Sequence, residues 1–156
     1  PAQLKERGRA TLKAFGVKSR FVHFEFFRLT KARKGLGEVG DFVGLETNMR
    51  PAGGYTPDMM NFAHSTDVYT IWADMVVSDK RLLAESGDDH WCVYYGRRDA
   101  HTYVHDDNAV MACYGARMAM TGRIPAAIAP DLGDRMFMAH IRSEEELQEY
   151  LRYLSE

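Results

Sequence analysis

Two acidic side chains and one carboxamide in the first third of the chain have the types and spacing of a divalent-metal site. Glu25 lies within an aromatic and β-branched run, residues 21–27, which predicts a strand. Glu46 and Asn48 close a second predicted strand that begins at Asp41, and they share a face because strand side chains alternate. Oxygen donors of this kind suit Mg²⁺ or Mn²⁺.

The segment between the two strands carries a glycine-rich turn sequence at residues 34–37. Folding the chain there predicts a hairpin over residues 20–50 in which Glu25 lies opposite Glu46. Glu25 also interrupts an apolar strand, where an unpaired carboxylate would be costly to bury. The alternative is a pair of ordinary solvated strand residues, since Glu-x-Asn occurs by chance in many proteins.

A cation and a glycine pair follow the second strand. Arg50 comes two residues after Asn48, so strand alternation would place its guanidinium beside the same face. Gly53 and Gly54 form a loop that can offer backbone N–H groups to an anion. Metal, cation and amide-rich loop together predict a polyphosphate site, with Arg50 as its catalytic candidate.

These residues resemble the metal-binding end of the ATP-grasp superfamily, which includes biotin carboxylase, D-alanine–D-alanine ligase and carbamoyl-phosphate synthase. The resemblance rests on a strand glutamate followed downstream by Glu-x-Asn-x-Arg, and residues 50–61 look closest to carbamoyl-phosphate-synthase-like proteins of bacteria. It covers residues 1–80 well and the remainder weakly. It implies that Glu25 and Glu46 hold Mg²⁺, that Glu46 and Asn48 serve a second ion, and that Arg50 contacts the transferred phosphate.

The function that this resemblance implies is an ATP-dependent ligase or synthetase that activates a carboxylate, or bicarbonate, as an acyl phosphate. Few residues precede Glu25, and the first residue is Pro1 rather than Met. The expectation is therefore the carboxy-terminal half of an ATP-grasp fold, inactive alone, whose amino-terminal subdomain belongs to the same parent chain. Two alternatives remain: a non-catalytic interaction or regulatory module that keeps the metal face, and a metal-dependent phosphohydrolase.

Composition narrows the class of protein. The chain has 156 residues, 46% of them hydrophobic and 27% charged, which predicts one globular domain over 1–156. A net charge of −2 gives no bulk basic field for nucleic acid, and no apolar run approaches the about 18 residues that span a membrane. Cys92 and Cys113 form no Cys-x-x-Cys pair, which favours reduced thiols and a cytoplasmic location. The oligomeric state stays open, a homo-oligomer included.

The order of elements predicts an α+β fold, a largely antiparallel sheet flanked by helices, resembling the carboxy-terminal subdomain of an ATP-grasp fold. Helices are expected over residues 4–15, 66–79, 107–120 and from 143 onward. In the weakly matching tail, 90–156, strands are expected at 91–95, 102–104 and 135–141, the first two as a hairpin. An apolar stripe in the second helix is expected to be core; it comprises Val68, Ile71, Trp72, Met75 and Val76.

The histidines offer no zinc spacing and the sequence suggests no hydrolytic nucleophile. His23 shares the predicted strand face with Glu25, although a packed strand histidine is the favoured interpretation because hard cations prefer oxygen. His64 follows the glycine loop and could help to bind an anion.

Overall fold

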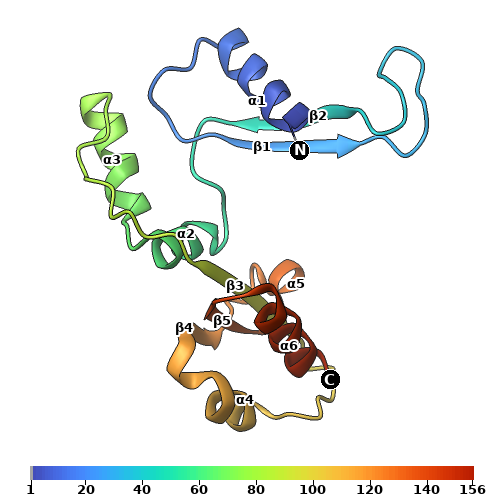
Figure 1. Cartoon of the computed structure of the whole chain (residues 1–156), viewed down its shortest axis with the longest axis vertical. Coiled ribbons are helices and arrows are strands. Elements are labelled where there is room, and N and C mark those ends of the chain that lie inside the picture. The colour runs from blue at the N-terminus through green and yellow to red at the C-terminus, as the bar shows by residue number, and fades with distance from the viewer. Residues whose placement is uncertain (1) are drawn as a thin grey trace. The chain divides into compact units, whose positions relative to one another are not determined.

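The computed structural model describes residues 2–156, which form two compact units (Figure 1). One unit contains the chain up to Gly53 together with Val68–Ala84, and the other contains Gly54–Asp67 and Glu85–Glu156. Each unit has its own small antiparallel sheet, of two strands in the first and three in the second, flanked by helices. The fold class is α+β. Length and composition predicted a single domain, but they carry no information on how contacts group along the chain.

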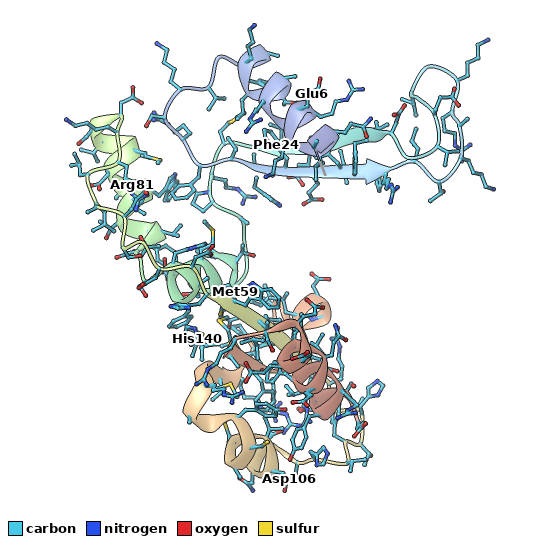
Figure 2. All side chains as sticks on the ribbon, viewed as in Figure 1. Glu6, Phe24, Met59, Arg81, Asp106 and His140 are labelled. Carbon is cyan, nitrogen blue, oxygen red and sulfur yellow. The ribbon has the colours of Figure 1, made fainter. Side chains whose placement is uncertain are left out.

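The first unit holds the candidate metal residues on a two-stranded sheet. Its elements are α1 (Ala2–Ala14), β1 (His23–Arg28), β2 (Phe42–Asn48) and α3 (Val68–Ser78). Helix α1 lies against the sheet face that carries Phe24 and Phe26 (Figure 2). A Cβ on Gly8 of α1 would lie 3.5 Å from the Phe24 ring, and the rings of Phe24 and Phe26 meet edge to face at 5.9 Å. Because side chains alternate along β1, His23 and Glu25 lie on the other face.

Both predicted helices of this unit are present. Helix α1 ends at a left-handed glycine, Gly16, with φ of 63°, whose N–H donates to the carbonyl of Lys13. Helix α3 buries only the start of its predicted core stripe: Val68 and Ile71 are 1% and 4% exposed. Trp72 and Val76 are 41% and 56% exposed, so the prediction of a core stripe is wrong for them.

The second unit is built on a three-stranded sheet with the order β3-β5-β4 and both pairings antiparallel. One face, with Phe137, Ala139 and Ile141 of β5, packs against α4 and α6. The other face, with Met136, packs against Ile124 and the short helix α5. The elements are α2 (Thr56–His64), β3 (Trp91–Arg97), α4 (Asp107–Tyr114), η1 (Gly115–Arg117), β4 (Met118–Arg123), α5 (Ala129–Leu132), β5 (Arg135–Ile141) and α6 (Glu144–Ser155).

The predicted strand and helix after residue 134 are confirmed. The predictions for residues 91–120 are partly wrong. The strand at 135–141 and the terminal helix are present, and the Ser143 hydroxyl caps α6 by accepting from the Glu146 N–H at 3.2 Å. The hairpin of 91–95 with 102–104 is wrong, because β3 pairs along its whole length with β5 and 102–104 form no strand. The helix expected over 107–120 ends at Tyr114, and the chain enters β4 at Met118. Among the described helices, none is long and apolar enough to cross a membrane.

A buried arginine joins the sheet to the chain after it. Arg97 is fully buried, with its guanidinium 4.3 Å from the centre of the Tyr103 ring. Its Nε donates to the carbonyl of Leu154 at 3.0 Å, and its Nη1 donates to the carbonyl of His105 at 2.6 Å. Arg97 thereby fixes the end of α6 and the irregular segment before α4.

Asp99 connects two arginines of the same sheet and makes the stability of this unit depend on pH. Hydrogen bonding from Arg123, and then the charges of Arg123 and Arg135, hold the pKa of Asp99 below its usual range; Arg135 Nε lies 3.0 Å from Asp99 Oδ1. A carboxyl with a lowered folded-state pKa stabilises the fold above its unfolded pKa of about 3.9, and this stabilisation is lost as the pH falls through the folded value.

Asp99→Asn is therefore expected to lower the free energy of unfolding at pH 6 and to flatten its fall between pH 5 and pH 3. Urea unfolding followed by amide signals of β5 measures this. Asp131→Asn, at an exposed position of α5, is the control and should keep the wild-type pH dependence. An unchanged slope in Asp99→Asn would show that these ion pairs do not form in solution.

Candidate functional site

The candidate site is the face of the β1–β2 hairpin that carries Glu25 and Glu46. These two residues are direct partners in the antiparallel register, and His23 is the direct partner of Asn48. Directly opposed residues of antiparallel strands project their side chains to the same side of the sheet. The predicted register is confirmed, and all four side chains belong to one face.

The turn between β1 and β2 lies where the sequence predicts it, at residues 34–37. The Arg33 N–H donates to the carbonyl of Gly37 at 2.9 Å, and Arg33 and Gly37 form an isolated β-bridge. Gly35 has φ of 83°, a left-handed conformation that glycine adopts without strain. The hairpin thus closes through a turn that its own glycines allow.

A bulge in β2 lies directly beside the acidic pair. Glu25 pairs with Glu46, whereas the next residue of β1, Phe26, pairs with Gly44, so Leu45 is the extra residue of β2. Bulges bend a strand, increase its local twist and re-aim neighbouring side chains. The Glu25–Glu46 pair therefore lies directly beside the bulge. No pattern in the sequence predicts the bulge.

Asn48 orients one of the two carboxylates. Its Nδ2 donates to Glu46 Oε1 at 2.7 Å, a short distance typical of a hydrogen bond to a charged acceptor. This contact leaves Glu46 Oε2 and the Asn48 carbonyl oxygen as oxygen donors on the same face. The pair of residues predicted to serve one ion is thus already coupled.

Among residues 2–156, one ring nitrogen of His23 has no hydrogen-bond partner. Its Nε2 lies 3.8 Å from Glu25 Oε1, too far for a hydrogen bond, and its Nδ1 is buried without a hydrogen-bond partner among the described residues. The side chains of His23 and Glu25 are 30% and 44% exposed. Glu25 is therefore partly solvated, and the burial cost expected for it does not arise.

A metal ion on this face would need ligands from a substrate as well as from the protein. In the part of the chain that the structure describes, no three His, Cys, Asp or Glu side chains are grouped closely enough to hold a metal ion. Mg²⁺ is commonly bound through one or two carboxylates and completes its octahedron with waters and substrate phosphates. Glu25, Glu46 and the Asn48 carbonyl oxygen match that pattern.

The residues predicted to bind phosphate are less constrained. Strand β2 ends at Asn48 and the chain then bends, so strand alternation does not extend to Arg50. Arg50 is exposed, and its Nη1 donates to the carbonyl of Pro51 at 2.9 Å. Gly53 and Gly54 are exposed, and the boundary between the two units falls between them. A role for these three residues at a phosphate stays a prediction.

No protein-family model matches the chain, and no curated protein matches it. The ATP-grasp resemblance stays a prediction from the sequence.

The two cysteines differ in exposure. Both are free thiols; Cys113 is exposed and Cys92 is partly buried. Burial raises the pKa of the Cys92 thiol to about 11, so it is almost entirely protonated at neutral pH and a poor nucleophile.

Proposed function

We propose that this chain supplies the metal and phosphate side of the ATP site of a ligase that activates a carboxylate, or bicarbonate, as an acyl phosphate. The observation that carries the proposal is the register of the hairpin, which sets Glu25 opposite Glu46 on one solvent-accessible face. The hydrogen bond from Asn48 to Glu46 supports it, since it pre-orients one of the carboxylates.

The chemistry requires positive charge at this place. Transfer of the γ-phosphoryl group of ATP to a carboxylate brings two anions together, and Mg²⁺ or Mn²⁺, when bound, offsets their repulsion and aligns the phosphates. Glu25 and Glu46 hold the ion by charge, and Asn48 fixes the orientation of Glu46. Arg50 adds a guanidinium that can pair with phosphoryl oxygens once its contact with Pro51 is released.

Titration of the 156-residue chain with Mn²⁺, followed by NMR, tests the metal assignment. Sub-stoichiometric Mn²⁺ is expected to broaden first the amide signals of residues 23–25 and 46–48, because paramagnetic broadening falls steeply with distance from the ion. Excess Mg²⁺ should restore these signals, and ATP should strengthen Mn²⁺ binding. Broadening that centres on the acidic residues at the start of α6, Glu144, Glu145 and Glu146, would contradict the assignment.

A further inference from the structure

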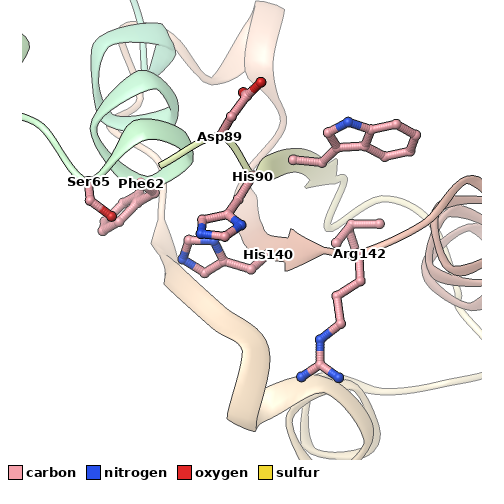
Figure 3. A pocket seen from close by; sticks show the side chains of 8 residues that line it. Phe62, Ser65, Asp89, His90, His140 and Arg142 are labelled. Atoms are coloured by element: carbon pink, nitrogen blue, oxygen red, sulfur yellow. The ribbon is translucent and has the colours of Figure 1, made fainter. Parts of the chain in front are cut away.

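The second unit contains a hollow that its histidines share and that the proposed ATP chemistry does not use. It has a volume of about 640 Å³ and is lined by residues of α2, the segment before β3, β3 itself and the end of β5 (Figure 3). Ligand pockets for small molecules commonly measure about 300–1,000 Å³. The lining residues are Phe62, Ser65, Asp89, His90, Trp91, His140, Ile141 and Arg142.

Two imidazoles form the middle of this hollow. The rings of His90 and His140 meet edge to face with their centres 6.4 Å apart, and the His140 ring meets Phe62 in the same way at 6.2 Å. In the pairing of β3 with β5, His140 lies opposite Cys92, two residues after His90, and the backbone N–H of His90 donates to the carbonyl of Ala63 at 2.8 Å. The hydrogen bonds found among residues 2–156 engage no ring nitrogen of His90 or His140, so these nitrogens are available to a ligand.

Arg142 adds a permanent positive charge on one side of the imidazole pair, and Ser65 adds a hydroxyl on the other (Figure 3). The backbone N–H of Arg142 donates to Glu146 Oε2 at 2.6 Å, which fixes where its side chain leaves the sheet. The Glu146 carboxylate pairs with Arg117. Within the described part of the chain, no carboxylate lies in ion-pair contact with the Arg142 guanidinium.

The one acidic residue of the lining does not neutralise the hollow. The Asp89 side chain is 87% exposed and points away from the imidazole pair in Figure 3. Its Oδ1 lies 3.6 Å from Nδ1 of His64. The polar groups that remain in the lining are the two imidazoles, the Ser65 hydroxyl and the Arg142 guanidinium, and the Phe62 ring lies beside His140.

We propose that this hollow binds the phosphate group of a small phosphate monoester, with Phe62 contacting a flat apolar part of the same ligand. A phosphate offers three acceptor oxygens, which suits a site whose donors come from two imidazoles, a guanidinium and a hydroxyl. The site consists only of residues of the second unit. Its test is therefore independent of the test of the metal site on the hairpin.

Phenyl phosphate is the probe, titrated into the 156-residue chain with the imidazole signals of His90 and His140 followed by NMR. Both signals are expected to shift in one saturable process. Inorganic phosphate should bind about tenfold more weakly, because it lacks the ring that buries apolar surface. Benzoate that binds as tightly as phenyl phosphate would overturn the phosphate assignment, and the absence of any shift would overturn the site.

Arg142→Gln is expected to weaken phenyl phosphate binding about tenfold, as for loss of one charge-assisted hydrogen bond, and His90→Asn should act in the same direction. Both positions are exposed, so the fold should tolerate these changes. Arg152→Gln on the exposed side of α6 and His101→Asn in the loop after β3 are the matched controls. Equal affinity in Arg142→Gln and Arg152→Gln would refute the assignment of Arg142.

Discussion

Replacing Glu46 by glutamine is expected to weaken Mn²⁺ binding by about a hundredfold or more without lowering the melting temperature. The substitution keeps the shape of the side chain and an Oε1 that can still accept from Asn48 Nδ2. It removes the charge that would hold the ion beside Glu25. Glu46 is exposed and faces a second carboxylate, so loss of its charge relieves repulsion, and the melting temperature should be unchanged or slightly higher.

Isothermal titration with Mn²⁺ and thermal unfolding, measured on the same preparations, give the two quantities. Glu38→Gln is the matched control, because Glu38 is an exposed acid in the loop that joins the same two strands. It should leave both quantities at their wild-type values. A large fall in melting temperature with Mn²⁺ affinity intact would make Glu46 a structural residue and remove the metal assignment.

The hairpin was predictable because everything that defines it is local. Period-two alternation and glycines near the turn specify which residue faces which, so Glu25 opposite Glu46 follows from a segment of under 30 residues. The bulge and the hydrogen bonding of the side chains could not be predicted from this local pattern. The bulge at Leu45, the bond from Asn48 to Glu46 and the unpartnered His23 Nδ1 depend on packing that alternation does not encode.

No helix is predicted from the sequence at α2, because the pair Gly53 and Gly54 just before it indicates a loop. Pro57 lies in the first turn of the helix, where its missing N–H would have no partner in any case. The Met59 N–H already donates to the carbonyl of Tyr55 at 2.9 Å. A proline near the start of an apolar run is thus compatible with a helix that begins just before it.

The predicted helix over 107–120 includes the first three residues of strand β4, because alanine and methionine have high helix propensity. In the structure Met118 pairs with Ala139, and Met120 pairs with Met138, at the centre of the second unit. This pairing outweighs local preference. The same sheet brings together His90 and His140, which are distant in sequence, so the phosphate site could not be identified before the order β3-β5-β4 was known.

Replacing Gly96 by alanine is expected to destabilise the second unit by about 3 kcal/mol or more. A Cβ at Gly96 would lie 1.9 Å from the carbonyl oxygen of Leu132 and 3.0 Å from its carbonyl carbon. These are backbone atoms and cannot rotate away. The Tyr94 hydroxyl also donates to this oxygen at 2.7 Å, which holds it against β3.

The segment that follows Leu132 is also held in place and cannot move away from β3. The Asp134 N–H donates to the carbonyl of Arg97 at 2.7 Å, and Gly133 has φ of 98°. A Cβ at Gly133 would itself lie 3.0 Å from the Arg97 carbonyl oxygen. Two backbone segments therefore approach each other through two glycines, and a methyl group between them must separate α5 from β3. The melting temperature of this unit should fall by more than about 10 °C.

Gly115→Ala is the control that separates this close approach from the general effect of glycine on the unfolded chain. Gly115 belongs to the same unit, has right-handed helical angles (φ −54°, ψ −37°), and a Cβ there would meet only Met111 Cε at an ordinary 3.6 Å. Alanine at this position should be neutral or stabilise by up to about 1 kcal/mol, because it restricts the unfolded state. Chemical denaturation of the three proteins, followed by the NMR amide signals of Trp91 and of β5, gives the comparison. If Gly96→Ala were as stable as wild type while Gly115→Ala behaved as expected, the contact between β3 and the end of α5 would not exist in solution.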